Sequence, residues 1–173
     1  MEAYVKEKKQ GVTSPFKLFI FLITVILALA IFLRPGYVKV IMISNQETGV
    51  VYLSEVVEYP YRISYGWIHS FENIPWTEDY IINEDNSLLL KRIKVAGFGA
   101  GIPNNKGIVS IDDNGMIIMD KIDQEFPKVN WINSNTALEY IKVNGEILIT
   151  GSELPHHEFL ELEVKERVKL WIK

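Results

Sequence analysis

The N-terminal part of the chain contains one uninterrupted apolar run. It extends from Leu18 to Leu33, reads LFIFLITVILALAIFL, and contains no charged residue. Such a run predicts a membrane-inserted helix. At 1.5 Å per residue it reaches about 24 Å, so Lys17 and Arg34 must help to span a hydrocarbon core about 30 Å thick. We therefore expect three parts, namely a cytoplasmic segment at residues 1–17, a transmembrane anchor at residues 18–34 and an extracytoplasmic domain at residues 35–173.

The charges that flank this run predict its orientation. Four lysines precede Leu18, whereas only Arg34 and Lys39 follow closely. The positive-inside rule then predicts a single-pass protein of the cell membrane, with its N-terminus in the cytoplasm and its C-terminal domain outside. A cleaved signal peptide is the alternative, because Ala28 and Ala30 form an AxA pattern. The apolar run continues beyond Ala30 without a helix breaker, which favours the uncleaved anchor.

From Tyr37 onward, apolar and polar residues alternate with the period of β-strands. Asn-Gly pairs at residues 114–115 and 144–145 predict type I′ hairpin turns. The last two strands are expected at residues 158–166 and 168–172. This pattern predicts an all-β domain, an antiparallel β-sandwich or partly open barrel of about 10–12 short strands.

Composition narrows the functional classes. The chain has 173 residues, no cysteine and a formal net charge of −4. The absence of cysteine excludes disulfides, thiolate metal sites and cysteine nucleophiles. The acidic balance disfavours a nucleic-acid partner.

Polar and aromatic residues gather in two blocks, IHSFENIPWTEDY and GFGAGIP. Polar groups this close to an apolar strand are costly to bury unless they are paired. We therefore place a candidate site for binding a ligand or partner in these blocks. Its residues are His69, Ser70, Glu72, Trp76, Glu78, Gly97, Gly99, Ala100, Gly101 and Pro103.

A hairpin should bring the two blocks together. Strands are predicted at Glu78–Asp85 and Ser87–Ala96, with a short turn between them. Antiparallel strands of similar length bring their outer ends together. We expect Trp76 or Glu78 within side-chain reach of the glycines, which either form an anion-binding backbone nest or permit close packing.

Other chemistry at the first block is less well supported. His69, Glu72 and Glu78 are residue types that bind Zn or Ca, but their spacing matches no metal motif, and whether a metal binds stays open. His69 and Ser70 suggest a hydrolase, yet neighbours along a strand point to opposite faces, which disfavours an enzyme. The structural alternative is a buried His69 imidazole held by Glu72 or Glu78. No cofactor is expected.

Together, the two blocks resemble the signature of a domain-of-unknown-function family, DUF1850. Its members are similar in size and are commonly encoded beside the fused membrane subunit and the solute-binding protein of TAXI-type TRAP transporters. The resemblance implies a membrane-anchored accessory or binding domain that has these two proteins as partners and serves an organic-anion transporter. A metal-assisted surface hydrolase using His69, Glu72 and Glu78, or a purely structural anchor domain, are the alternatives.

Overall fold

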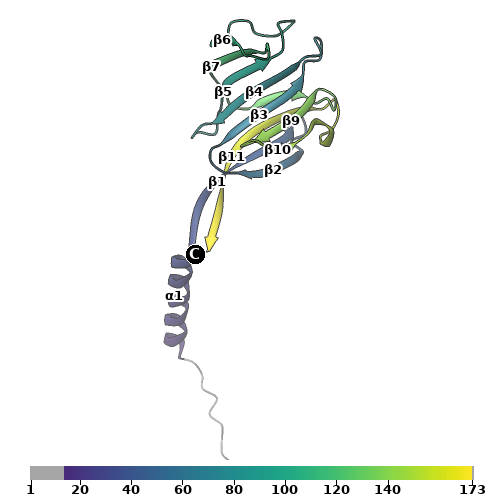
Figure 1. The fold of residues 1–173 in the computed structure, drawn as a ribbon. Helices are drawn as coiled ribbons and strands as arrows, with labels where there is room; N and C mark the ends of the chain where they lie inside the picture. Colours follow the sequence, from purple (N-terminus) through teal and green to yellow (C-terminus); the bar gives the residue numbers. More distant parts are fainter. Residues whose placement is uncertain (1–13, 173) are drawn as a thin grey trace, which may run out of the picture. The chain divides into compact units, whose positions relative to one another are not determined.

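The computed structural model describes residues 14–172, which fall into two compact units, residues 14–36 with 168–172 and residues 37–167. In the first unit, helix α1 spans Pro15–Phe32 (Figure 1). The predicted helix is thus confirmed as a helix, with earlier bounds than the 18–34 expected for an anchor. Its side chains from Phe16 to Leu27 are all exposed. Across the described part of the chain, no helix combines the length and apolarity that a membrane span requires.

Residues 33–172 contribute eleven β-strands and one 3₁₀ turn, η1, in the part that the structure describes. The elements are β1 (Leu33–Asn45), β2 (Val51–Val57), β3 (Arg62–Ile68), β4 (Pro75–Ile82), β5 (Leu88–Val95), β6 (Ile108–Ile111), β7 (Ile117–Phe126), β8 (Val129–Ile132), β9 (Leu138–Val143), β10 (Glu146–Ile149), η1 (Gly151–Glu153) and β11 (Phe159–Ile172).

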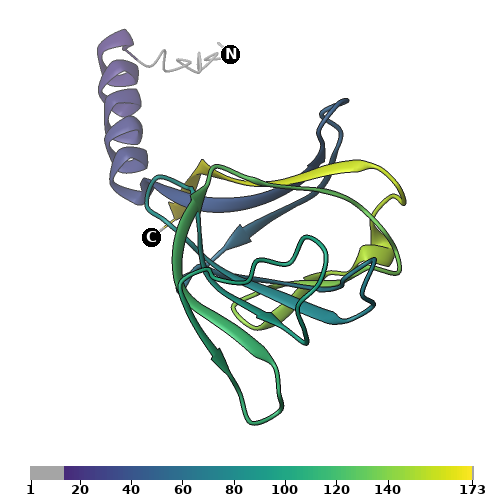
Figure 2. The same ribbon diagram turned by 90° about the horizontal axis from the view of Figure 1, so that it is seen from above.

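The strands form two sheets. One has the order β2-β1-β11-β8 and the other the order β10-β9-β3-β4-β5-β7-β6. Every strand pair with a described register is antiparallel. Figure 2 shows strands of both sheets around a common interior. The predicted antiparallel β-sandwich is therefore confirmed, and the strand count lies within the expected range.

Alternating apolar residues build one core between the two sheets. Leu160 and Leu162 of β11 are fully buried, and so are Ile63 and Tyr65 of β3 in the other sheet. All four belong to one hydrophobic cluster. Burying a side chain such as leucine contributes about 1.5–3 kcal/mol. The shared core fixes which face of β3 and β4 points inward, and this face carries the candidate site.

Two details differ from the sequence prediction. The turn at Asn144 and Gly145 has positive φ at both residues, 53° and 93°, as type I′ requires, but at residues 114–115 only Gly115 is positive. There Asp112 Oδ1 accepts the N–H groups of Asn114 and Met116, both at 2.9 Å, and so stabilises a different turn.

The two strands predicted near the C-terminus are one continuous strand. β11 extends without a break from Phe159 to Ile172, so the expected gap at Arg167 is wrong. Lys165, Glu166 and Arg167 are exposed. Their charges remain in water while the backbone stays extended, which is why a charged triplet does not end the strand.

Candidate functional site

The inner faces of β3 and β4 place aromatic residues around one carboxylate. In the antiparallel register, Tyr65 lies opposite Glu78, and Trp67 lies opposite Trp76. Residues two apart on a strand share a face, so Trp76 and Tyr80 flank Glu78 on its own strand. The site therefore follows from period-two alternation on two paired strands.

Two aromatic donors hold the Glu78 carboxylate. The Trp76 Nε1–H group donates to Glu78 Oε1 at 3.1 Å, and the Tyr80 hydroxyl donates to Oε2 at 2.6 Å. Glu78 is half-buried, and it lines a cavity beside these rings. Burial raises the pKa of Glu78, although both hydrogen bonds act in the opposite direction. Burial likewise raises the pKa of Tyr80, and the nearby Glu78 charge adds to that shift.

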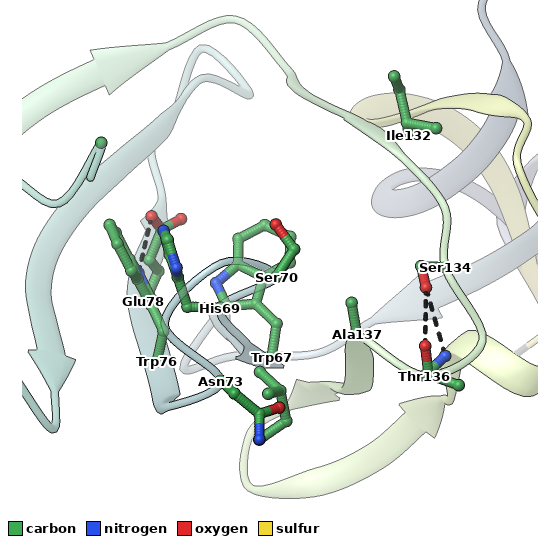
Figure 3. Close-up of a pocket in the computed structure, with 12 residues that line it drawn as sticks. Trp67, His69, Ser70, Asn73, Trp76, Glu78, Ile132, Ser134, Thr136 and Ala137 are labelled. Atoms are coloured by element: carbon green, nitrogen blue, oxygen red, sulfur yellow. Dashed lines mark hydrogen bonds between the residues drawn. The ribbon is translucent and has the colours of Figure 1, made fainter. Parts of the chain in front are cut away.

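A cavity of about 560 Å³ opens beside this carboxylate. Figure 3 shows His69, Trp76 and Glu78 on one side, with Ile132, Ser134 and Thr136 on the other. A second cavity, of about 820 Å³, adjoins it and also contacts Lys106 and Lys128. Four residues line both cavities, namely Trp67, Trp76, Glu78 and Gly101.

His69 forms part of the cavity wall. Its ring stacks on that of Trp76, with centroids 5.8 Å apart and planes 12° apart. Its Nδ1 accepts the backbone N–H of Glu72 at 3.2 Å, so a neutral imidazole carries its proton on Nε2. The predicted buried imidazole is wrong in two respects, because His69 is only half-buried and because the main chain of Glu72, rather than a carboxylate, holds it.

Ser70 lines the same cavity as His69. β3 ends at Ile68, so residues 69 and 70 belong to a turn, and both line the same cavity. Strand alternation, on which the prediction of opposite faces rests, therefore does not apply to these two residues. Within residues 14–172, however, no hydrogen bond joins the His69 ring to the Ser70 hydroxyl, and the arrangement is not that of an activated nucleophile.

The two sequence blocks are spatial neighbours, as predicted. Glu72 Oε1 accepts the backbone N–H of Ala100 at 3.2 Å. A Cβ atom on Gly99 would lie 2.4 Å from the same oxygen, so this contact requires glycine there. Gly101 lines the cavity together with Trp76 and Glu78. The expected carboxylate on this backbone is thus supplied by the protein itself.

The remaining glycine-block residues have separate positions. Pro103 lines the second cavity, beside Gly101. Gly97, Gly99 and Ala100 line neither cavity. At Gly97 the space is open enough for a side-chain carbon, since the nearest atom to an added Cβ would be Ile74 Cδ1 at 3.6 Å. Only the end of the GFGAGIP block therefore contributes to the cavity walls.

The three residues considered for a metal site do not converge. Glu72 binds Ala100, whereas Glu78 is held between Trp76 and Tyr80. Among the residues with a described placement, no group of three or more His, Asp or Glu side chains is arranged to hold a metal ion. The metal-assisted alternative built on His69, Glu72 and Glu78 therefore has no structural basis.

Sequence reasoning missed several residues at this site, among them Trp67, which lines the cavity, and Tyr65, which packs against the Trp67 ring without lining the cavity. Tyr65 and Trp67 lie just before the first block, and their alternation with Ser64 and Gly66 was a usable signal, because it places both on the face that carries Trp76. Tyr65 is fully buried, and its hydroxyl has no hydrogen-bond partner among the described residues. Ser134 and Thr136 come from the loop after β8, which no local pattern relates to β4.

Comparison with protein families identifies a related family. A family model described as "Domain of unknown function (DUF1850)" matches residues 63–148. This segment extends from β3 to β10 and contains both sequence blocks. Neither curated proteins nor solved structures give a match.

Proposed function

The chain belongs to the DUF1850 family through residues 63–148, and from that membership we propose that it is a membrane-anchored binding domain for a small organic ligand. The cavity beside Glu78 is the observation that supports this most directly. Its volume of about 560 Å³ falls within the usual range of small-molecule sites. Residues of both sequence blocks line this cavity, so a shared binding site explains why the two blocks occur together in one chain.

The membrane anchor rests on α1. Its exposed side chains from Phe16 to Leu27 are almost all apolar, and keeping such a surface in water is unfavourable. The 18 residues of α1 reach about 27 Å, so residues beyond its ends must complete a span of about 30 Å. We propose the orientation that the lysines before Leu18 favour, with the N-terminus in the cytoplasm and the β-domain outside.

The partner that we propose is a TAXI-type TRAP transporter, through its membrane subunit and its solute-binding protein. The resemblance of the two blocks motivates this choice, and an extracytoplasmic ligand cavity suits a protein that handles a transported solute. A purely structural anchor would need no cavity lined by a half-buried carboxylate and two tryptophans. A binding role therefore explains more of the site than either alternative.

Co-purification tests the proposed association. The full-length tagged protein would be extracted from its own membranes in a mild detergent and isolated, and mass spectrometry would identify what accompanies it. We expect the TRAP membrane subunit, with or without the solute-binding protein, and we expect neither with an unrelated tagged single-pass protein. Isolation of the chain without either transporter protein would contradict the association, and its recovery in the soluble fraction would contradict the anchor.

A further inference from the structure

The Glu78 carboxylate has no positively charged partner. Both of its hydrogen bonds come from neutral donors, Trp76 and Tyr80, and each of its oxygens keeps a free lone pair. The ion pairs of the described residues join other side chains, and none includes Glu78. A partly buried carboxylate without a cation is unfavourable, because part of its hydration is lost without a compensating charge.

The two lysines near the cavities are bound elsewhere. Lys106 Nζ donates to Gln124 Oε1 at 2.5 Å, and Lys128 Nζ pairs with Glu161 Oε2 at 2.5 Å. The charge of Lys106 acts on Glu78 only from a distance and is the weakest influence on its pKa. Neither ammonium group therefore fills the space in front of the carboxylate.

Aromatic rings pack around Glu78, and two of them, Trp67 and Trp76, line the cavity. Tyr65 lies opposite Glu78, and Trp67 lies opposite Trp76. The rings of Tyr65 and Trp67 are 5.4 Å apart, and those of Tyr65 and Tyr80 are 5.9 Å apart. Ring faces attract cations, and tryptophan does so most strongly. The cavity wall thus combines a carboxylate with two tryptophan rings, and both kinds of group favour positive charge.

We infer that this cavity recognises an organic ammonium group, whose charge pairs with Glu78 while Trp67 and Trp76 contact the carbon atoms bound to its nitrogen. The inference rests on the proposed binding function and names its ligand class. A simple anion would instead meet the like charge of Glu78. The ammonium group of a zwitterion, which carries a carboxylate in the same molecule, would pair with Glu78 in the same way.

A matched pair of probes tests the ligand class. Choline carries a trimethylammonium group, and replacing its nitrogen by carbon gives a neutral alcohol of the same shape. We expect the full-length protein in detergent to bind choline at least about tenfold more tightly than this alcohol, measured by calorimetry. Glu78→Gln should lower choline affinity by about tenfold and leave the affinity for the alcohol unchanged. Glu139→Gln, at an exposed position on β9, should change neither affinity.

Other outcomes would overturn the inference. Equal affinity for choline and the alcohol, or tighter binding of the carboxylate with the same tert-butyl group, would overturn it while leaving the cavity a binding site. Binding of none of the three probes at millimolar concentration would overturn it too, and co-purification would still judge the transporter association separately. If Glu78→Gln fails to fold, Trp67→Leu replaces it, with the same expected loss for choline.

Discussion

Replacing Asn133 with alanine is expected to lower the free energy of unfolding by about 3 kcal/mol. Asn133 follows β8 and is fully buried. Its Nδ2 donates to the carbonyl oxygens of Gly151 and Pro155, each at 3.0 Å, and of Leu154 at 3.3 Å. The alanine variant leaves these carbonyls without their donor, and the penalty of desolvating them is then not compensated.

Denaturant unfolding of the purified variant measures this loss. The matched control is Asn130→Ala, the same substitution at an exposed position of β8, which should change the free energy of unfolding by less than about 0.5 kcal/mol. Asn133→Asp keeps the acceptor but removes the donors, so we expect it to be destabilising as well. A small effect at residue 133, equal to that at residue 130, would show that the segment after β10 does not depend on this amide.

Replacing Gly66 with alanine is expected to lower the free energy of unfolding by about 2 kcal/mol, because the added methyl group overpacks the core. Gly66 is buried in β3 and lies opposite Tyr140 of β9. A Cβ atom on Gly66 would lie between 2.3 and 2.7 Å from three ring atoms of Tyr140, closer than real contacts allow. Lys142 Nζ lies 4.1 Å from the centre of the same ring, so displacing the ring also disturbs this contact.

A double-mutant cycle isolates that clash. The double variant Gly66→Ala/Tyr140→Ala should lose at least about 1 kcal/mol less free energy of unfolding than the two single variants lose together. The reason is that the ring that obstructs the new methyl group is gone. Gly97→Ala is the control, since its added methyl group meets only Ile74 Cδ1, at 3.6 Å. Thermal or denaturant unfolding gives all four values. Strict additivity would mean that backbone effects, and not the Tyr140 ring, explain the loss.

Much of the fold could be predicted because alternation is a local property. Each strand shows this alternation within a few residues, and the two residues Asn144 and Gly145 are enough to specify their hairpin turn. The predictions were wrong where a residue outside the local pattern, or contact with solvent, decides the backbone conformation. The turn at residues 114–115 depends on the Asp112 side chain, and the continuity of β11 through Arg167 depends on solvent reaching its charged residues.

The site was predicted in position but not in composition. One hairpin, β4 with β5, joins the two blocks, so their proximity follows from a short stretch of sequence. The packing of aromatic rings around Glu78 depends on the register of β3 against β4, which sets Tyr65 opposite Glu78, and single-strand patterns do not specify register. Glu72 accepts a hydrogen bond from the main chain of Ala100 because of the conformation of the two loops. The residue types alone do not reveal that conformation.

Glu78 also affects how the domain responds to acid. Burial raises its pKa in the folded state, so its contribution to stability is complete below its unfolded pKa and is lost as pH rises through the folded value. Glu158 is linked to protons in the opposite sense, because hydrogen bonds from Tyr52 and Asn45 lower its pKa and its contribution is lost as pH falls. Above its folded pKa the partly buried Glu78 charge therefore carries unfavourable free energy, and a cation that pairs with it stabilises the fold as it binds.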